Sequence, residues 1–244
     1  MEPEFDAEGL FDDDYLYFYQ DLIDPRSDAE ADQIWDLLGL EPGAELLDLA
    51  CGHGRLANPL AALGCRVTGL DSAGTFLEHA RADAAARGVE VDYRLGDMRE
   101  LPWTDRFDAV INWFTAFGYF SDEGNREVLA QVHRALRPGG RFAMELNNLA
   151  NLLPRYQRDV VRTRGEDMAI DEHHLDPVTL RSHVRRTLIR GSERRTVRYS
   201  VRLLTAPELR TWLAEAGFRE IEILGEDGER LTTDHRRMIV TARA

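Results

Sequence analysis

The chain has 244 residues, of which 43% are hydrophobic and 9% aromatic, which suffices for one large domain with a packed core. That composition excludes wholesale disorder, and no apolar run approaches the roughly 18 residues that a membrane span needs. The N-terminus is acidic where a secretory signal would be basic, and two cysteines, Cys51 and Cys65, are too few for a disulfide scaffold. We therefore expect a cytoplasmic globular protein.

The net charge of −14 is unevenly distributed along the chain. Residues 1–48 hold 16 acidic residues and one base, Arg26, for a net charge of −15, whereas residues 155–202 hold 12 arginines and seven acids, for +5. An acidic surface argues against non-specific nucleic-acid binding, and the arginine-rich segment keeps that alternative weakly open. Pairing of the two segments with each other, within one chain or across a homo-oligomer, is the other interpretation.

The first 40 residues are rich in acidic and aromatic side chains. Phe11, Tyr15 and Phe18 recur at helical spacing, and Tyr17 and Tyr19 lie beside them. We expect residues 1–40 to form a helical arm or lid.

Short apolar runs alternate with helical patterns between Glu45 and Asn147. Strands are predicted at residues 46–49, 67–70, 89–93, 107–113 and 142–146. Helices are predicted around residues 56–63, 76–84 and 128–136, the last one stopped by Pro138-Gly139-Gly140. This alternation predicts an α/β fold, with a doubly wound, mostly parallel sheet covered by helices on both faces.

The pattern changes after Asn151 to that of antiparallel strands. Residues 178–190 and 194–204 are predicted to pair across Gly191-Ser192-Glu193. On the second strand Val197, Tyr199, Val201 and Leu203 share one face and Arg198, Ser200 and Arg202 the other, which predicts an apolar side and an arginine-rich side. The acidic residues around His173 and His174 are typical of a solvated turn.

A helical pattern returns at the capping box of Thr205 and Glu208 and ends at Gly217, before two last strands at 221–224 and 238–241. We therefore divide the chain into the arm (1–40), a core (41–150 and 205–244) and an antiparallel insertion (151–204), which covers the substrate or mediates assembly.

Three motifs follow successive predicted strands. Asp48-Leu49-Ala50-Cys51-Gly52-His53-Gly54 forms a glycine-rich turn before a helix, where a ligand can approach backbone amides. Asp71 ends the second strand, where a carboxylate can accept both hydroxyls of a ribose, and Gly96-Asp97-Met98 follows the third, where it could bracket a purine edge. Since parallel strands end at the same edge of a sheet, we expect a nucleoside derivative there.

The glycine-rich turn is compatible with two nucleoside cofactors. Residues 52–57 fit the dinucleotide fingerprint, which leaves an NAD-dependent oxidoreductase as an alternative. Asp48 precedes the glycines, however, and an acid there suits an ammonium or a sulfonium better than a pyrophosphate. This favours S-adenosylmethionine.

In their order, these motifs together with Phe107-Asp108-Ala109-Val110 and Leu136-Arg137-Pro138-Gly139-Gly140 resemble those of the class I, seven-stranded S-adenosylmethionine-dependent methyltransferases. The resemblance covers residues 40–150 well and the C-terminal helix and strands loosely, and Ala50 stands where the family most often has glycine. It implies a Rossmann-like seven-stranded sheet, S-adenosylmethionine as cofactor, S-adenosylhomocysteine as product and no metal.

The resemblance also implies individual roles. Asp48 would hold the motif, Ala50, Gly52 and Gly54 would pack against the methionine part, and Asp71 would take the ribose hydroxyls, with Ser72 beside the adenine. Asp97 would accept the adenine amino group, the Met98 backbone would meet the ring, and the Asn112 carbonyl would face the ammonium. The full cofactor-binding set is Asp48, Ala50, Cys51, Gly52, Gly54, Asp71, Ser72, Asp97, Met98, Asn112, Trp113 and Phe114.

Five aromatic residues lie in the segment 113–120, beside the position expected for the methyl group. Facing the aromatic arm, they would close a dry pocket for a small molecule and stabilise a cation. The catalytic candidates are Tyr15, Tyr17, Phe117 and His53, with His53 as proton acceptor. Since methyl transfer is an in-line displacement, we expect positioning to dominate catalysis.

The aromatic segment and the tyrosine-rich arm are similar to bacterial N-methyltransferases of lincosamide and amino-sugar antibiotics, which implies an amine acceptor. The alternatives are a small-molecule O-methyltransferase with a His or Tyr base, an RNA methyltransferase, and a non-catalytic regulator that binds the cofactor. Metal-assisted transfer is not favoured, because His173 and His174 would point to opposite sides of a strand. Membrane partners are not expected.

Overall fold

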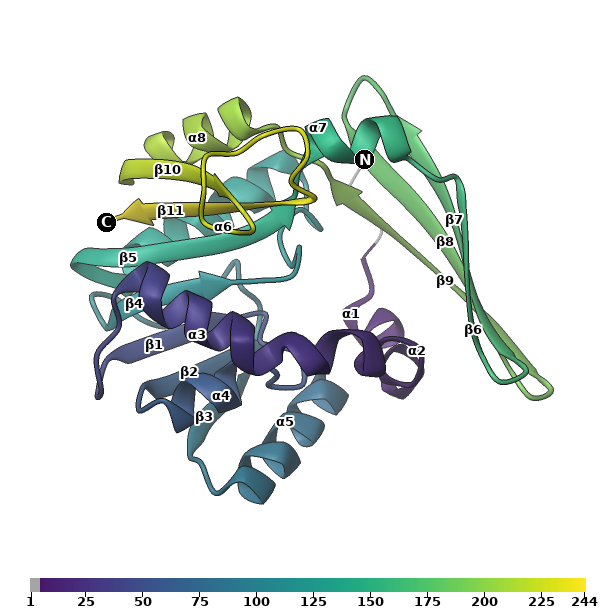
Figure 1. Ribbon diagram of the computed structural model, residues 1–244, viewed down its shortest axis with the longest axis horizontal. Helices are drawn as coiled ribbons and strands as arrows, with labels where there is room; N and C mark the ends of the chain where they lie inside the picture. The colour runs from purple at the N-terminus through teal and green to yellow at the C-terminus, as the bar shows by residue number, and fades with distance from the viewer. Residues whose placement is uncertain (1–4) are drawn as a thin grey trace.

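A central sheet organises residues 5–244, which are the residues that the computed structural model describes (Figure 1). Residues 1–4 of the expected arm lie outside the described part. Within it, the sheet has the strand order β10-β11-β5-β4-β1-β2-β3, with β11 antiparallel to both neighbours and the other pairs parallel. The strands are β1 (Glu45–Leu49), β2 (Arg66–Asp71), β3 (Val91–Leu95), β4 (Phe107–Asn112), β5 (Leu136–Asn147), β10 (Arg219–Gly225) and β11 (Arg237–Arg243).

Helices cover both faces of this sheet. On one face lie α3 (Ser27–Leu38), α4 (Ala57–Ala62) and α5 (Gly74–Arg87), and on the other α6 (Asp122–Ala135) and α8 (Ala206–Glu215). Along β1 the side chains alternate, so that Leu46 packs under α3 and α4 whereas Leu47 and Leu49 join the core of the opposite face. The predicted Rossmann-like, doubly wound α/β fold is confirmed.

One boundary differs from the prediction. Helix α6 ends at Ala135 and β5 begins at Leu136, so Pro138-Gly139-Gly140 lies within the strand and does not separate helix from strand. The strand accommodates these residues because its register with β4 shifts between Phe107 and Ala109 and because Gly139 adopts a left-handed φ of 79°.

The predicted arm of residues 1–40 contains α1 (Ala7–Leu10), α2 (Asp13–Ile23), the short 3₁₀ turn η1 (Asp24–Arg26) and α3, of which α3 packs on the core sheet. From here on, the arm means residues 5–26. The side chain of Asp12 caps α2 by accepting hydrogen bonds from the amides of Asp14 and Tyr15. The buried face of α2 carries Leu16, Phe18, Tyr19 and Ile23. No helix among residues 5–244 is long and apolar enough to cross a bilayer.

The insertion forms a second, antiparallel sheet in the order β6-β7-β8-β9, which extends away from the core with the arm beside it (Figure 1). It comprises α7 (Leu149–Leu152), η2 (Leu153–Arg155), β6 (Asp159–Arg164), β7 (Asp167–Asp176), β8 (Arg181–Arg190) and β9 (Glu193–Arg202).

One expectation about the insertion was wrong. The segment around His173 and His174 is the strand β7 and not a solvated turn, and its Asp171 is buried and accepts hydrogen bonds from Arg186 over 2.7 and 2.9 Å. On β9, Ser200 and Arg202 of the predicted arginine-rich face are buried, because this end of the strand docks on the core, where Arg202 pairs with Glu208.

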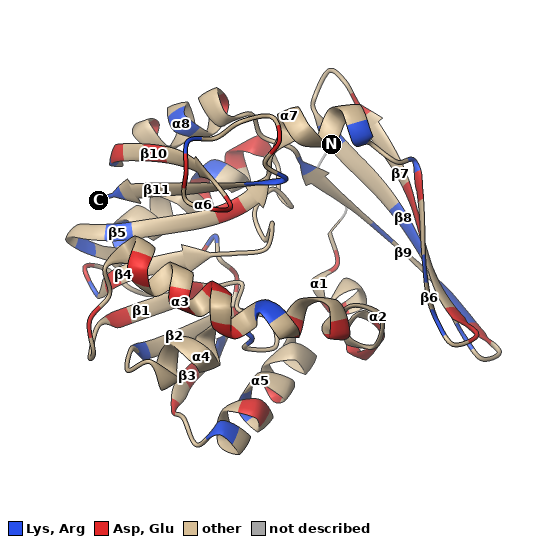
Figure 2. Cartoon of the chain, in the orientation of Figure 1, with Lys and Arg blue, Asp and Glu red and all other residues tan. Residues whose placement is uncertain are grey.

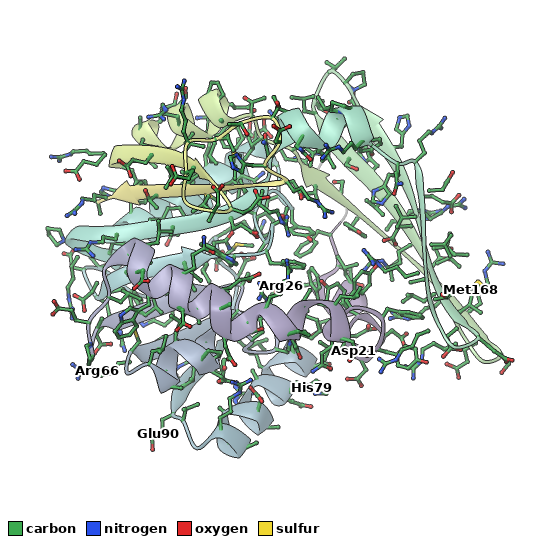
Figure 3. The ribbon with its side chains drawn as sticks, in the orientation of Figure 1. Asp21, Arg26, Arg66, His79, Glu90 and Met168 are labelled. Atoms are coloured by element: carbon green, nitrogen blue, oxygen red, sulfur yellow. The ribbon has the colours of Figure 1, made fainter. Side chains whose placement is uncertain are left out.

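The acidic arm and the arginine-rich insertion pair within one chain. Arg164 lies 3.0 Å from Asp21, Arg190 lies 2.7 Å from Asp14, and Arg195 pairs with Asp14 at 2.8 Å. Figure 2 shows acidic residues on the arm and arginines on the neighbouring strands, and Figure 3 shows Asp21 on the side of α2 that faces the insertion. The intramolecular form of the predicted pairing is therefore confirmed.

Candidate active site

The carboxyl ends of β1 and β4 define the crevice of the sheet. From β1 the chain continues to β2 and β3 on one side and then returns to β4 on the other, which makes the β1–β4 boundary a topological switch point. Ligands of open α/β sheets bind outside the strands at such a point. The three predicted motifs all lie along this edge.

The loop after β1 has a left-handed backbone at alternate residues. The φ angles of Ala50, Gly52 and Gly54 are 61°, 56° and 81°. Glycine adopts this conformation freely, whereas alanine at position 50 bears a strain of about 1 kcal/mol.

Asp71 ties this loop to the end of β2. Its Oδ2 accepts a hydrogen bond from the amide of Gly52 and its Oδ1 one from the amide of Ala73, both over 2.8 Å. Burial raises the pKa of Asp71, and the backbone donors oppose that rise. The carboxylate therefore lies at the wall of the crevice in a fixed orientation.

A cavity of about 200 Å³ lies beside Asp71. Five predicted cofactor-binding residues line it: Ala50, Asp71, Ser72, Asp97 and Met98. Phe5 and Ala7 of the arm line it as well. Burial raises the pKa of Asp97, but hydrogen bonds from Arg99 outweigh it and hold that pKa below its usual value. The structure thus brings together the residues assigned to ribose and adenine.

Gly54 and Cys51 face the interior of the core. A Cβ on Gly54 would lie 2.3 Å from the hydroxyl of Tyr93, which itself donates to Asn58 over 2.6 Å. Cys51 is buried, and burial raises the pKa of its thiol well above the ordinary value. The close packing of the loop on Tyr93 therefore explains why position 54 requires glycine, and the motif alone does not reveal this reason.

The floor of the crevice combines a buried acid with an unpaired acceptor. Burial of Asp48 raises its pKa to about 7, against the opposing effect of Arg55. Asn112 donates from Nδ2 to the carbonyl of Leu49 over 2.9 Å, while its buried Oδ1 has no partner within residues 5–244. Both groups fit a ligand with a positively charged end.

Trp113 is buried after β4, and the next two residues form a strained turn. Phe114 and Thr115 have φ angles of 61° and 57°, which are unfavourable for such side chains. Glu145 of β5 stabilises the turn, because its carboxylate accepts from the amide of Phe114 over 3.0 Å and its carbonyl from the amide of Thr115 over 2.9 Å. Burial raises the pKa of Glu145.

Three arginines surround the ring of Phe114. The guanidinium carbons of Arg26, Arg55 and Arg237 lie 5.9, 5.1 and 5.0 Å from its centroid. Arg26 lies at the junction of the arm and α3 (Figure 3). The sequence prediction missed Arg55 and Glu145, although Arg55 directly follows the last glycine of the motif, a position that could have indicated it.

Two of the four catalytic candidates meet at Phe76 of α5. The Tyr15 ring lies 5.6 Å and the His53 ring 5.9 Å from the Phe76 ring, and Nε2 of His53 lies 2.8 Å from Oδ1 of Asp24. Within the described residues, the Tyr15 hydroxyl and Nδ1 of His53 make no hydrogen bond.

The other two candidates lie elsewhere. The Tyr17 hydroxyl donates to Asp167 of the insertion over 2.8 Å, on the opposite side of α2 from Tyr15. Phe117 is fully buried in the core under α6 and α8. The structure therefore does not bring these two residues to Tyr15 and His53.

The arm meets the aromatic segment after β4. Tyr119 lies 4.8 Å from Phe5, 5.9 Å from Phe11 and 6.3 Å from Tyr199 of the insertion, measured between ring centroids. Arm, core and insertion thus each contribute rings to one wall. A larger hollow of about 460 Å³ lies on the insertion sheet around His174 and His183 and contains no predicted site residue.

Comparison with known proteins places this geometry in context. The methyltransferase domain family matches residues 46–140. Residues 46–140 are therefore similar to a methyltransferase domain. The matched segment contains the motif loop, Asp71, Asp97 and β4, so the resemblance seen in the sequence is confirmed there.

Several proteins are similar to this chain. The ubiquinone biosynthesis O-methyltransferase of Methylobacterium sp. (strain 4-46) is 41% identical over 110 residues, and the match covers 44% of this chain and 43% of that protein. The chain thus spans less than half the length of this curated relative. The structure of the CcbJ methyltransferase of Streptomyces caelestis has a TM-score of 0.82 at 23% identity, covering 98% of this chain and 99% of that one. SAM-bound CalS10, an amino pentose methyltransferase of Micromonospora echinaspora, has a TM-score of 0.64 at 22% identity, with 90% and 91% covered.

Proposed function

We propose that this protein transfers the methyl group of S-adenosylmethionine to a nitrogen of a small-molecule amine. The observation that carries the proposal is the cavity lined by Ala50, Asp71, Ser72, Asp97 and Met98, together with the buried Asp48 and the unpaired Oδ1 of Asn112 toward the carboxyl ends of β1 and β4. A nucleoside with a cationic amino-acid end matches this set of groups. The residues present therefore fit the cofactor.

When bound, S-adenosylmethionine supplies an electrophilic methyl group on a sulfonium. In this chain Asp71 holds the ribose, Asp97 and Met98 hold the adenine, and Asp48 and Asn112 hold the ammonium. Tyr15, Phe11 and Tyr119 exclude water from the acceptor side, and such rings favour a cationic amine by about 0.5–2 kcal/mol per contact. Nδ1 of His53 accepts the proton that the amine loses, and positioning supplies the rest of the catalysis.

Two considerations support an amine as acceptor. The aromatic wall favours a cation, and the similar CalS10 is described as an amino pentose methyltransferase. In this account the insertion and the arm form the cover of the acceptor site, with Tyr17 attaching the arm to the insertion. The acidic arm argues against an RNA acceptor.

O-methylation is the second candidate, because Asp24 holds His53 in the orientation of a general base. The similarity to a ubiquinone biosynthesis O-methyltransferase favours it as well.

A panel of small amines and phenols, incubated with the protein and S-adenosylmethionine, tests the proposal through formation of S-adenosylhomocysteine. We expect turnover of amines and loss of turnover in Asp71→Asn. Turnover of hydroxyl acceptors alone would replace the amine by the second candidate, and His53→Gln should then abolish it.

A further inference from the structure

Arg55 stands out among the buried charges of the site because one half of its guanidinium is unsatisfied. The side chain is 8% exposed, and its Nη1 donates to Oε2 of Glu30 over 2.7 Å. Its Nη2 is buried and has no hydrogen-bond partner within residues 5–244. Buried donors are nearly always paired in folded proteins, and a charged donor more so. An acceptor atom at this position is therefore missing from the protein itself.

The neighbouring carboxylates already have partners. Glu30 engages Arg55 through Oε2 and lies 3.6 Å from Arg26 through Oε1. Glu145 accepts the amide of Phe114 at Oε2 and lies 3.2 Å from Arg237 at Oε1. Asp24 lies 2.8 Å from His53. Among the described residues, neither these carboxylates nor the buried Asp48, which interacts electrostatically with Arg55, makes a hydrogen bond with Nη2.

Three arginines lie around the ring of Phe114, namely Arg26, Arg55 and Arg237. Glu30 and Glu145 pair with them, and Arg55 also interacts electrostatically with Asp24 and Asp48. Within residues 5–244 none of these carboxylates makes a hydrogen bond with Nη2 of Arg55. A carboxylate from a ligand would pair with this side of the planar guanidinium in favourable geometry.

Arg55 also lies between the two halves of the site. It follows Gly54 of the cofactor loop and interacts electrostatically with Asp48 at the floor of the crevice and with Tyr15 of the arm. We propose that Nη2 of Arg55 binds a carboxylate of the ligand that fills this site. This rests on the proposed function for the identity of the ligand, and the carboxylate belongs either to the amino-acid part of the cofactor or to the acceptor.

Calorimetry with two probes separates the sources. S-adenosylhomocysteine carries the amino-acid carboxylate and 5′-methylthioadenosine does not. If the carboxylate belongs to the cofactor, Arg55→Gln should lower the affinity for S-adenosylhomocysteine by about 10- to 100-fold. The affinity for 5′-methylthioadenosine should fall by less than about twofold. Arg55→Lys, which keeps the charge but not the planar fork, should lie in between. Arg94→Gln is the control, because Arg94 is an exposed arginine on β3 that pairs with Asp92, and it should leave both affinities unchanged.

For an acceptor carboxylate, both nucleosides should bind Arg55→Gln as they bind the unaltered protein. Acetate titrated into the S-adenosylhomocysteine complex should then bind the unaltered protein and not Arg55→Gln. Unchanged nucleoside affinities together with acetate binding that does not depend on Arg55 would overturn the proposal. Thermal melting shows whether Arg55→Gln is folded. If it is not, the same measurements with the same probes are made on Arg55→Lys, and their outcome decides for or against the proposal.

Failure of the proposed function gives a different pattern. The unaltered protein would then bind no S-adenosylhomocysteine, and acetate binding to the protein alone would decide whether Arg55 is a carboxylate site. Loss of that binding in Arg55→Gln would retain the proposal, and its persistence would contradict it.

Discussion

The amide of Gly52 donates a hydrogen bond to Oδ2 of Asp71 over 2.8 Å, which joins the loop after β1 to the end of β2. The two motifs that the sequence places 19 residues apart are thereby one structural unit. Because Asp71 also lines the cavity, the same carboxylate orients the loop and faces the ligand.

Asp71→Asn tests this double role. We expect affinity for S-adenosylhomocysteine to fall by about 10- to 100-fold, because a charge-assisted hydrogen bond contributes about 1.5–3 kcal/mol. Calorimetry measures it. Asp92→Asn, at an exposed acid on β3, is the control and should bind as the unaltered protein does. Equal affinities of the two variants would remove Asp71 from the site.

The buried Asp48 makes stability depend on pH. Its pKa is raised from 3.8 in the unfolded chain to about 7, so its contribution is fully present below about pH 4 and is lost as the pH rises through 7. Asp48→Asn has no carboxyl to titrate and lacks this loss. The free energy of unfolding of the variant, relative to that of the unaltered protein, should therefore rise by about 2–3 kcal/mol from pH 5 to pH 8. Urea unfolding at the two pH values measures the gain, and a difference independent of pH would contradict the account.

Arg195 is the most connected of the arginines that hold the arm, because it pairs with Asp12 and Asp14 and donates to the carbonyl of Gly9. Arg195→Ala should speed amide hydrogen exchange in α2 by about 5- to 30-fold, with a smaller effect in 1 M salt. Arg94→Ala removes a similar exposed pair on β3 and should leave α2 unchanged. Equal exchange in both variants would mean that aromatic packing alone holds the arm.

Gly54 and Gly88 allow a comparison of close packing with backbone strain alone. Both have positive φ angles, 81° and 69°. A Cβ on Gly54 would lie 2.3 Å from the Tyr93 hydroxyl, whereas among residues 5–244 no atom beyond its immediate chain neighbours lies within 4 Å of a Cβ on Gly88. Gly88→Ala should destabilise the protein by about 1 kcal/mol, and Gly54→Ala by about 3 kcal/mol or more. Tyr93→Phe should recover part of the second loss. Equal unfolding free energies of the two alanine variants would exclude the packing explanation.

The sequence predicts the strands and the residues at their ends, because these depend on the local pattern of apolar and polar side chains. Leu46, Leu47 and Leu49 predict a strand by their apolar run, and the acid that ends the next strand follows from the same periodicity. These elements fix the edge of the sheet where the cavity lies. The contacts within the insertion could not be predicted in this way. The Arg186–Asp171 pair depends on the register of β7 against β8, which the alternation of side chains alone does not specify.

Contacts between distant segments explain the remaining differences. Tyr17 and Tyr15 are equally aromatic in the sequence, but their positions on α2 direct Tyr17 to Asp167 of the insertion and Tyr15 to Phe76. Arg55 becomes notable only once Glu30 is seen to satisfy one side of its guanidinium and no described residue is seen to satisfy the other. No pattern within a short window contains that information.

The central claim is that the crevice at the β1–β4 boundary binds S-adenosylmethionine and its product. Calorimetric titration of the protein with S-adenosylhomocysteine, with NADH in a parallel experiment, tests it most directly. The account predicts micromolar binding of S-adenosylhomocysteine and none of NADH. Binding of NADH alone, or of neither, would contradict it and withdraw the roles given to Asp48, Asp71 and Asp97.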